Sequence, residues 1–114
     1  MKGDGNQRRA ERKKIREMIL VEDAISGFSL GRIGNISSSG LMLICPHRLH
    51  DDALYQLRFT LPDQDDGEDA TLEVGVHEQW SEQAAIPGQF WSGLRIIDIE
   101  PEAERRLVHW LEQT

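Results

Sequence analysis

A basic stretch near the N-terminus carries side chains that could bind a phosphorylated ligand. Residues 8–16 contain four arginines, which are Arg8, Arg9, Arg12 and Arg16. A guanidinium group is a planar cation that can donate two parallel hydrogen bonds to a phosphate, or to O6 and N7 of guanine. A charged stretch at a chain end is also commonly a solvated tail. The stretch therefore predicts anion binding only in combination with a second motif.

A polar motif of that kind, Asn35-x-Ser37-x-x-Gly40, follows after one strand-like segment and one turn. Asparagine and serine side chains can hydrogen-bond both a ligand and the local backbone. Gly40 permits either a positive φ or a close approach of another backbone. When this motif is taken alone, an ordinary hairpin turn stabilised by an Asx-type hydrogen bond is the favoured explanation. The two motifs together favour a receptor for a small anionic ligand such as a nucleotide.

Short apolar segments separated by turn residues indicate a mainly β fold. From Tyr55 to Leu61, apolar and polar residues alternate, which is typical of a strand with one buried face. Similar reasoning predicts six strands, over residues 18–21, 28–33, 41–44, 55–61, 72–80 and 90–99. Short strands at regular spacing favour a small six-stranded antiparallel (split) β-barrel over a parallel sheet.

A C-terminal helix is predicted over residues 101–112. Pro101 suits the first helical turn, and Glu102 and Glu104 lie near the positive end of the helix dipole. One face of this helix is apolar and carries Ala103, Leu107, Trp110 and Leu111. We expect this helix to cover one end or an open seam of the barrel. We divide the chain into a flexible basic arm, residues 1–11, and a barrel domain, residues 12–114.

The net charge of −7 is distributed unevenly along the 114 residues. Residues 1–16 contain seven basic and two acidic residues, whereas residues 17–114 contain six basic and eighteen acidic ones. An acidic body repels a long polyanion, so we expect no DNA or RNA partner. A small barrel that binds single-stranded nucleic acid would need basic and aromatic residues spread over a strand face. The single cysteine and the lack of a long apolar segment predict a cytoplasmic protein without membrane insertion.

Other reactive residue patterns give little support to catalysis or metal binding. Cys45-x-His47-x-x-His50 offers only three metal-capable side chains and no fourth ligand at a recognised spacing. The acidic loop at residues 62–69 places Pro62 at the first ligand position of a calcium loop, so that motif fails. Residues 37–39 are three serines without the glycines of a nucleophile elbow. We expect no enzyme, no metal site and no resident cofactor.

The arginine stretch and the Asn35 motif, placed on a six-stranded barrel with a C-terminal helix, resemble the PilZ domain family. That family carries Arg-x-x-x-Arg followed by (Asp/Asn)-x-Ser-x-x-Gly, and Asn35 is the less frequent choice at its position. The resemblance extends from about Arg8 to the end of the chain. Residues 93–98 are similar to the last strand of the family, and Trp80 stands where related domains often carry a tryptophan near the ligand.

The resemblance implies a receptor for cyclic di-GMP, a bacterial second messenger. Arg12 and Arg16 would contact guanine and phosphate, with Arg8 and Arg9 as auxiliary contacts. Arg8-x-x-x-Arg12 also fits the motif, and Arg16 is preferred because it directly precedes the first predicted strand. Asn35 and Ser37 would hydrogen-bond a guanine base and support the turn, and Gly40 would let the backbone close on the ligand. Trp80 would pack against a base or lie in the core.

The same resemblance implies a signalling mechanism and an alternative to it. Ligand binding would order the arginine arm across the barrel, and the new surface would signal to an unidentified protein effector. Family members act in motility, in virulence and in the exopolysaccharide synthesis that underlies biofilms, and the sequence does not choose among them. The alternative is a PilZ-like adaptor that works through protein contacts with weak or no nucleotide binding. We expect a monomer.

Overall fold

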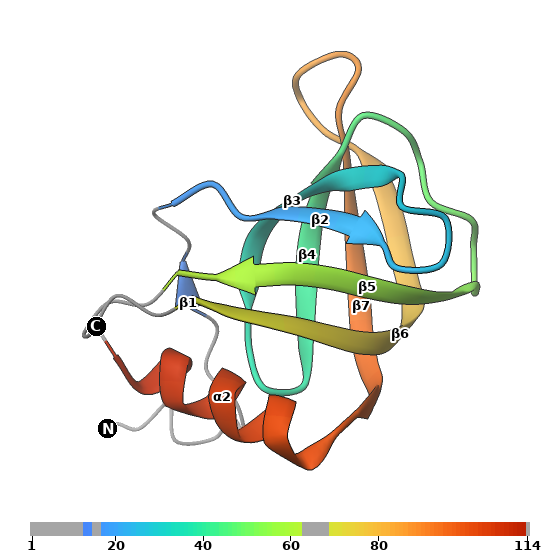
Figure 1. Cartoon of the computed structure of the whole chain (residues 1–114). Coiled ribbons are helices and arrows are strands. Elements are labelled where there is room, and N and C mark those ends of the chain that lie inside the picture. Colours follow the sequence, from blue (N-terminus) through green and yellow to red (C-terminus); the bar gives the residue numbers. More distant parts are fainter. Residues whose placement is uncertain (1–12, 15–16, 63–68, 114) are drawn as a thin grey trace, which may run out of the picture.

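The computed structural model describes residues 13–14, 17–62 and 69–113, and its strands form a barrel with one helix (Figure 1). The predicted arm, residues 1–11, lies outside the described residues, and so do Arg12, Arg16 and the middle of the acidic loop. The elements are β1 (Lys13–Lys14), β2 (Leu20–Asp23), β3 (Ser29–Ile36), β4 (Gly40–Cys45), β5 (Leu54–Leu61), β6 (Ala70–Gln83), β7 (Phe90–Ile99) and α2 (Pro101–Glu112).

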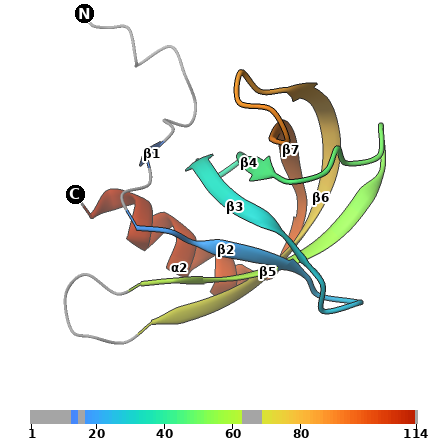
Figure 2. The same ribbon diagram turned by 90° about the horizontal axis from the view of Figure 1, so that it is seen from above.

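Six antiparallel strands close the barrel, which confirms the predicted fold. Their order is β3-β2-β5-β6-β7-β4, and β4 pairs with β3 to complete the circle (Figure 2). Closure leaves these strands without a free sheet edge over most of their length. The additional short strand β1 pairs with the far end of β3, beyond the point where β2 stops. Periodicity cannot reveal a strand of two residues, so β1 was not predicted.

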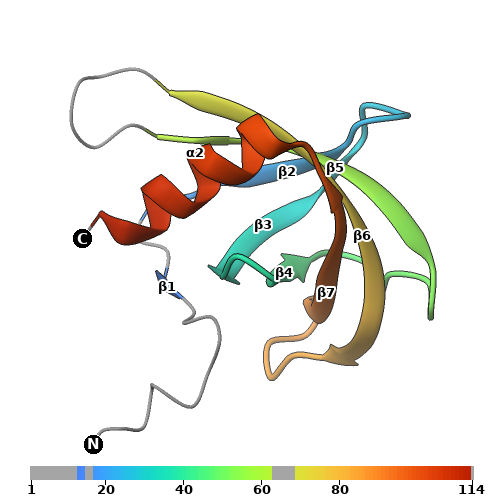
Figure 3. The same cartoon turned by 90° about the horizontal axis from the view of Figure 1, so that it is seen from below.

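Inward-facing side chains of all six barrel strands form one hydrophobic core. On β5, the alternation predicted from the sequence places Leu57, Phe59 and Leu61 inside, each with 2% of its surface exposed or less. Helix α2 crosses one end of the barrel and buries Leu107 and Trp110, with Ala103 and Leu111 packed beside them (Figure 3). This contact confirms the predicted apolar face of the helix.

Trp110 also fixes the helix to the barrel through a polar contact. Its indole nitrogen donates a hydrogen bond of 2.9 Å to the Pro62 carbonyl oxygen, just after β5. A buried indole needs such an acceptor, because an unpaired N–H would cost desolvation free energy. No helix in the described part of the chain is long and apolar enough to cross a membrane.

Several strand boundaries differ from those expected. The fifth predicted strand, residues 72–80, is the longer β6, which spans Ala70–Gln83 and contains two register shifts against β7. The first predicted strand, residues 18–21, is displaced to Leu20–Asp23, although Ile19 still accepts a backbone hydrogen bond from Ile33. Strand β7 and helix α2 have the predicted bounds.

Candidate ligand-binding site

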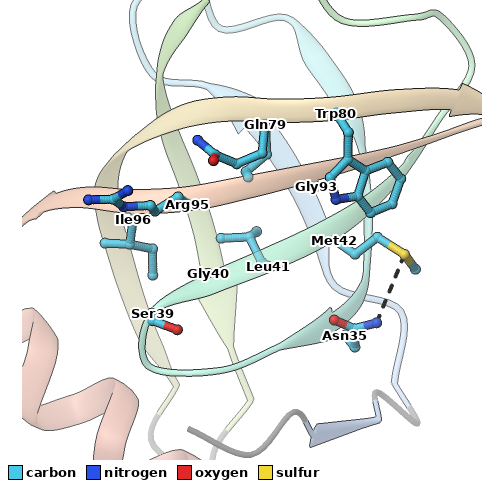
Figure 4. Close-up of a pocket in the computed structure, with 11 residues that line it drawn as sticks. Asn35, Ser39, Gly40, Leu41, Met42, Gln79, Trp80, Gly93, Arg95 and Ile96 are labelled. Carbon is cyan, nitrogen blue, oxygen red and sulfur yellow. Dashed lines mark hydrogen bonds between the residues drawn. The ribbon is translucent and has the colours of Figure 1, made fainter. Parts of the chain in front are cut away.

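A pocket of about 640 Å³ lies on the outer surface of the barrel, where β3, β4, β6 and β7 run side by side (Figure 4). Its lining combines polar, aromatic and aliphatic residues, and comprises Asn35, Ser39, Gly40, Leu41, Met42, Gln79, Trp80, Gly93, Leu94, Arg95 and Ile96. Three residues of the sequence-predicted site, Asn35, Gly40 and Trp80, therefore come together in one pocket. Side chains from four strands converge here only because the barrel is closed between β3 and β4.

Strand β1 brings the basic N-terminal stretch to the edge of this pocket. Lys14 pairs with Asn35, and Lys13 pairs with Ile36 in the antiparallel sense. The chain therefore runs from Lys14 through Lys13 towards the turn that follows Ile36. The predicted arginine contacts, Arg8, Arg9, Arg12 and Arg16, lie outside the described residues. Within this stretch, the described pairing that reaches the pocket is the one between Lys14 and Asn35.

The turn after β3 is held by the hydroxyl of Ser37. Its Oγ accepts hydrogen bonds of 3.2 Å from the backbone N–H groups of Ser39 and Gly40. The Ser37 N–H donates to the Gly40 carbonyl over 2.8 Å. Ser37 is 1% exposed and does not line the pocket. Its hydroxyl therefore supports the turn from behind, through bonds to Ser39 and Gly40, which do line the pocket.

Gly40 is required by a close backbone approach. A Cβ atom at this position would lie 2.6 Å from the Leu94 carbonyl oxygen of β7, which is closer than real Cβ contacts. The positive-φ residues of the described chain do not include Gly40. The sequence left two roles open for Gly40, a positive φ or a close approach of another backbone, and the structure supports the close approach. It allows β4 and β7 to pair tightly beneath the pocket.

Trp80 forms a flat wall of the pocket. Its indole lies over Gly93, where an added Cβ would be 2.2 Å from the indole nitrogen Nε1. Trp80 is 44% exposed, so the alternative of a core tryptophan does not hold. A partly exposed indole in a pocket is suited to stacking on a nucleobase. Because Gly93 has no side chain, the indole ring can lie directly against the backbone of β7.

A bulge in β6 turns Trp80 outward. Glu78 pairs with Leu94, but Trp80 pairs with the next residue of β7, Gly93, so Gln79 is an extra residue. Strict alternation from Leu72 would have placed Trp80 on the inner face of the strand. Because a bulge shifts this phase, Gln79 and Trp80 both face the pocket. Alternation alone therefore misplaces Trp80, and it gives no sign that Gln79 and Trp80 share one face.

A buried polar network lies behind the bulge. The Ser81 hydroxyl donates to Glu78 Oε2 over 2.7 Å, and the backbone N–H of Asp52 donates to Glu78 Oε1 over 2.7 Å. Ser81 also contacts the Ser92 hydroxyl at 2.8 Å. Cys45 adjoins this network through Ser92, and burial raises the pKa of its thiol to about 11. In the described part of the chain, no three His, Cys, Asp or Glu side chains gather where they could hold a metal ion.

Within the described part of the chain, Arg95 carries the charge of the pocket. Among the lining residues it is the one with a charged side chain, and none of the ion pairs found between described residues includes it. A guanidinium without an ion pair among the described residues, in the same pocket as an exposed indole, favours an anionic ligand with an aromatic part. The sequence placed Arg95 in the last strand but gave it no role, because only the pairing of β7 with β4 and β6 shows what it faces.

The comparisons with known proteins show which family the chain belongs to. The family model described as "PilZ domain" matches residues 6–113, so the chain belongs to the PilZ domain family. This is a family of ligand-binding receptors and is not known as a family of enzymes. No curated protein matches the chain by sequence.

Three solved structures share the fold at low sequence identity. The inhibitor of motility MotI/DgrA of Bacillus subtilis superposes with a TM-score of 0.73 and 12% identity, over 90% of this chain and 48% of that one. YcgR of Escherichia coli in complex with c-di-GMP superposes with a TM-score of 0.69 and 14% identity, over 92% of this chain and 44% of that one. PlzA of Borreliella burgdorferi in complex with c-di-GMP superposes with a TM-score of 0.52 and 15% identity, over 96% of this chain and 55% of that one. The chain thus spans about half the length of these proteins.

Proposed function

We propose that this protein is a receptor for cyclic di-GMP that binds the nucleotide in the pocket beside Trp80. The observation that carries the proposal is the composition of that pocket. It joins an exposed indole, the amides of Asn35 and Gln79, and a single charged side chain, Arg95, in a molecule whose net charge is −7. Cyclic di-GMP offers guanine faces for stacking and phosphates for the cations. The structures of YcgR and PlzA in complex with this nucleotide support the choice of ligand.

In this proposal the arginine stretch completes the site from the side of β1. The sequence favoured Arg12 and Arg16 because Arg16 directly precedes the first predicted strand. The first strand of the structure is β1, which begins at Lys13, so the same criterion now selects Arg12 as the second arginine of the motif. We therefore propose that Arg8 and Arg12 form the clamp, with Arg9 and Arg16 as auxiliary contacts. Asn35 would read a guanine edge, while Ser37 and Gly40 hold the turn that positions it.

The arm also supplies the proposed output of the receptor. Ligand binding would fix residues 1–11 across the pocket, and the surface formed in this way would be recognised by a protein effector in the cytoplasm. Met18 and Leu20, which follow the arm closely, are exposed by 72% and 61% and would form the apolar part of that surface. The likeness to an inhibitor of motility makes swimming the first output to examine. The adaptor with weak or no nucleotide binding remains the second candidate, because the same apolar residues are exposed without ligand.

Calorimetric titration with cyclic di-GMP tests the proposal. We expect saturable heat in the micromolar range and a loss of affinity of about tenfold or more in Arg95→Ala, because a charge-assisted hydrogen bond is removed. Arg105→Ala is the matched control, since this exposed arginine lies on α2 and does not line the pocket. Folded protein that gives no heat at tens of micromolar nucleotide would exclude the receptor and leave the adaptor.

A further inference from the structure

Gln79 occupies a position in the pocket from which a base edge can be read. It is the extra residue of the β6 bulge, and its amide extends between Trp80 and Arg95 (Figure 4). A base stacked on the indole of Trp80 would therefore present its edge to a neighbouring side chain on the same strand. Whether this amide can distinguish one base from another depends on whether its orientation is fixed.

The hydrogen bonds of Gln79 fix the orientation of its amide. Nε2 lies 3.2 Å from the backbone carbonyl oxygen of His77, which can only accept a hydrogen bond. The same Nε2 lies 3.0 Å from His77 Nδ1, so this ring nitrogen is also an acceptor. A rotated amide would place Oε1 against two acceptors and would lose both hydrogen bonds.

The imidazole of His77 is held in turn by Asp52. Because Nδ1 accepts from Gln79, the ring proton resides on Nε2, which donates to Asp52 Oδ1 over 2.5 Å. The loop that carries Asp52 is itself tied to β6, since the Asp52 N–H donates to the buried carboxylate of Glu78. A chain of contacts thus runs from the Asp52 loop through His77 to the pocket.

The outcome is a side chain that presents an acceptor to the ligand. Both donor hydrogens of the Gln79 amide face His77, and no hydrogen bond between described residues ends on Oε1. The Watson–Crick edge of guanine carries two adjacent donors, N1–H and the 2-amino group. Adenine instead has a lone pair at N1, which would repel a fixed carbonyl oxygen.

We propose that Gln79 is a specificity-determining residue whose Oε1 accepts hydrogen bonds from N1–H and the 2-amino group of one guanine. His77 is the positioning residue that prevents the amide from rotating. This inference rests on the proposed binding of cyclic di-GMP and adds to it the basis of selection against adenine.

The proposed role of Gln79 can be tested by titrating the full chain with three cyclic dinucleotides. Calorimetry with cyclic di-GMP, cyclic di-IMP and cyclic di-AMP compares ligands that lose first the 2-amino group and then N1–H. We expect wild-type affinity to fall in that order, by about tenfold at the first step. Gln79→Ala should weaken cyclic di-GMP about tenfold and remove its preference over cyclic di-IMP. Gln83→Ala is the matched control, because Gln83 is exposed on the same strand and does not line the pocket.

His77→Ala separates positioning from a general structural effect. A freed amide can rotate and present its NH₂ group, so we expect the preference for guanine over adenine to narrow while thermal unfolding changes little. If His77→Ala lowers the affinity for all three dinucleotides by the same factor, His77 does not act by positioning the Gln79 amide. If Gln79→Ala retains both affinity and base preference, the inference about Gln79 is wrong, although the receptor stands. If the wild type binds none of the three dinucleotides, the proposed function itself fails.

Discussion

Ser81 donates a 2.7 Å hydrogen bond to the buried carboxylate of Glu78, and the two residues between them, Gln79 and Trp80, face the pocket. The bond spans the β6 bulge on its inner side. It closes the backbone detour that turns two consecutive side chains to the outer surface. The two residues of this contact, Glu78 and Ser81, do not themselves line the pocket whose shape they support.

Ser81→Ala tests the importance of this contact. Removing the hydroxyl leaves Glu78 Oε2 without its donor while Glu78 stays 3% exposed, so the free energy of unfolding should fall by about 1–3 kcal/mol. Urea denaturation measures the change. Thr71→Ala, which removes the exposed hydroxyl contact to Thr60, should change stability by less than about 0.5 kcal/mol. Equal effects of the two substitutions would show that the bulge does not depend on Ser81.

Two glycine substitutions should separate binding from folding. In Gly93→Ala the new methyl group collides with the indole of Trp80, a side chain that can move outward, so binding should weaken while the fold persists. In Gly40→Ala the methyl group meets the Leu94 backbone, which cannot move without disturbing the β4–β7 pairing. We therefore expect a clearly lower melting temperature for Gly40→Ala, by thermal denaturation, and a larger ratio of lost affinity to lost stability for Gly93→Ala. The reverse pattern would contradict the assigned contacts.

The register of the arginine clamp is open to direct measurement. Strand β1 selects Arg8 and Arg12, so Arg8→Ala should weaken cyclic di-GMP by about tenfold or more, and Arg16→Ala should have a smaller effect. Arg48→Ala, at an exposed arginine that pairs with Asp51 outside the pocket, is the control. A larger loss for Arg16→Ala than for Arg8→Ala would restore the register that the sequence favoured.

Because the thiol of Cys45 is buried, we expect the free energy of unfolding to fall at high pH. Burial raises its pKa from 9.0 to about 11, so the folded state binds a proton that the unfolded state releases. This contribution is fully present below pH 9 and is lost as the pH rises towards 11, by roughly 1.4 kcal/mol for each pH unit. The difference in unfolding free energy between wild type and Cys45→Ala isolates this effect from other titrations. A constant difference across this interval would contradict the burial of the thiol.

The sequence was sufficient for the features that depend on local pattern. Periodicity located the last strand and the helix, because their apolar residues recur regularly against one core. Features that depend on long-range pairing were not accessible. The exposure of Trp80 follows from a bulge that only the register against β7 reveals, and Arg95 enters the pocket through the same pairing. Lys13 and Lys14 form too short a strand to leave a periodic signal.

The most direct test of the central claim is the indole N–H signal of Trp80 in the nuclear magnetic resonance spectrum during titration with cyclic di-GMP. The chain has three tryptophans, so Trp110, whose indole is bound to the Pro62 carbonyl beneath α2, is an internal control. The account predicts that the Trp80 signal, assigned by Trp80→Phe, shifts and saturates with the affinity found by calorimetry, while the Trp110 signal stays in place. Saturable binding heat with an unmoved Trp80 signal would contradict the claim that the nucleotide binds in this pocket.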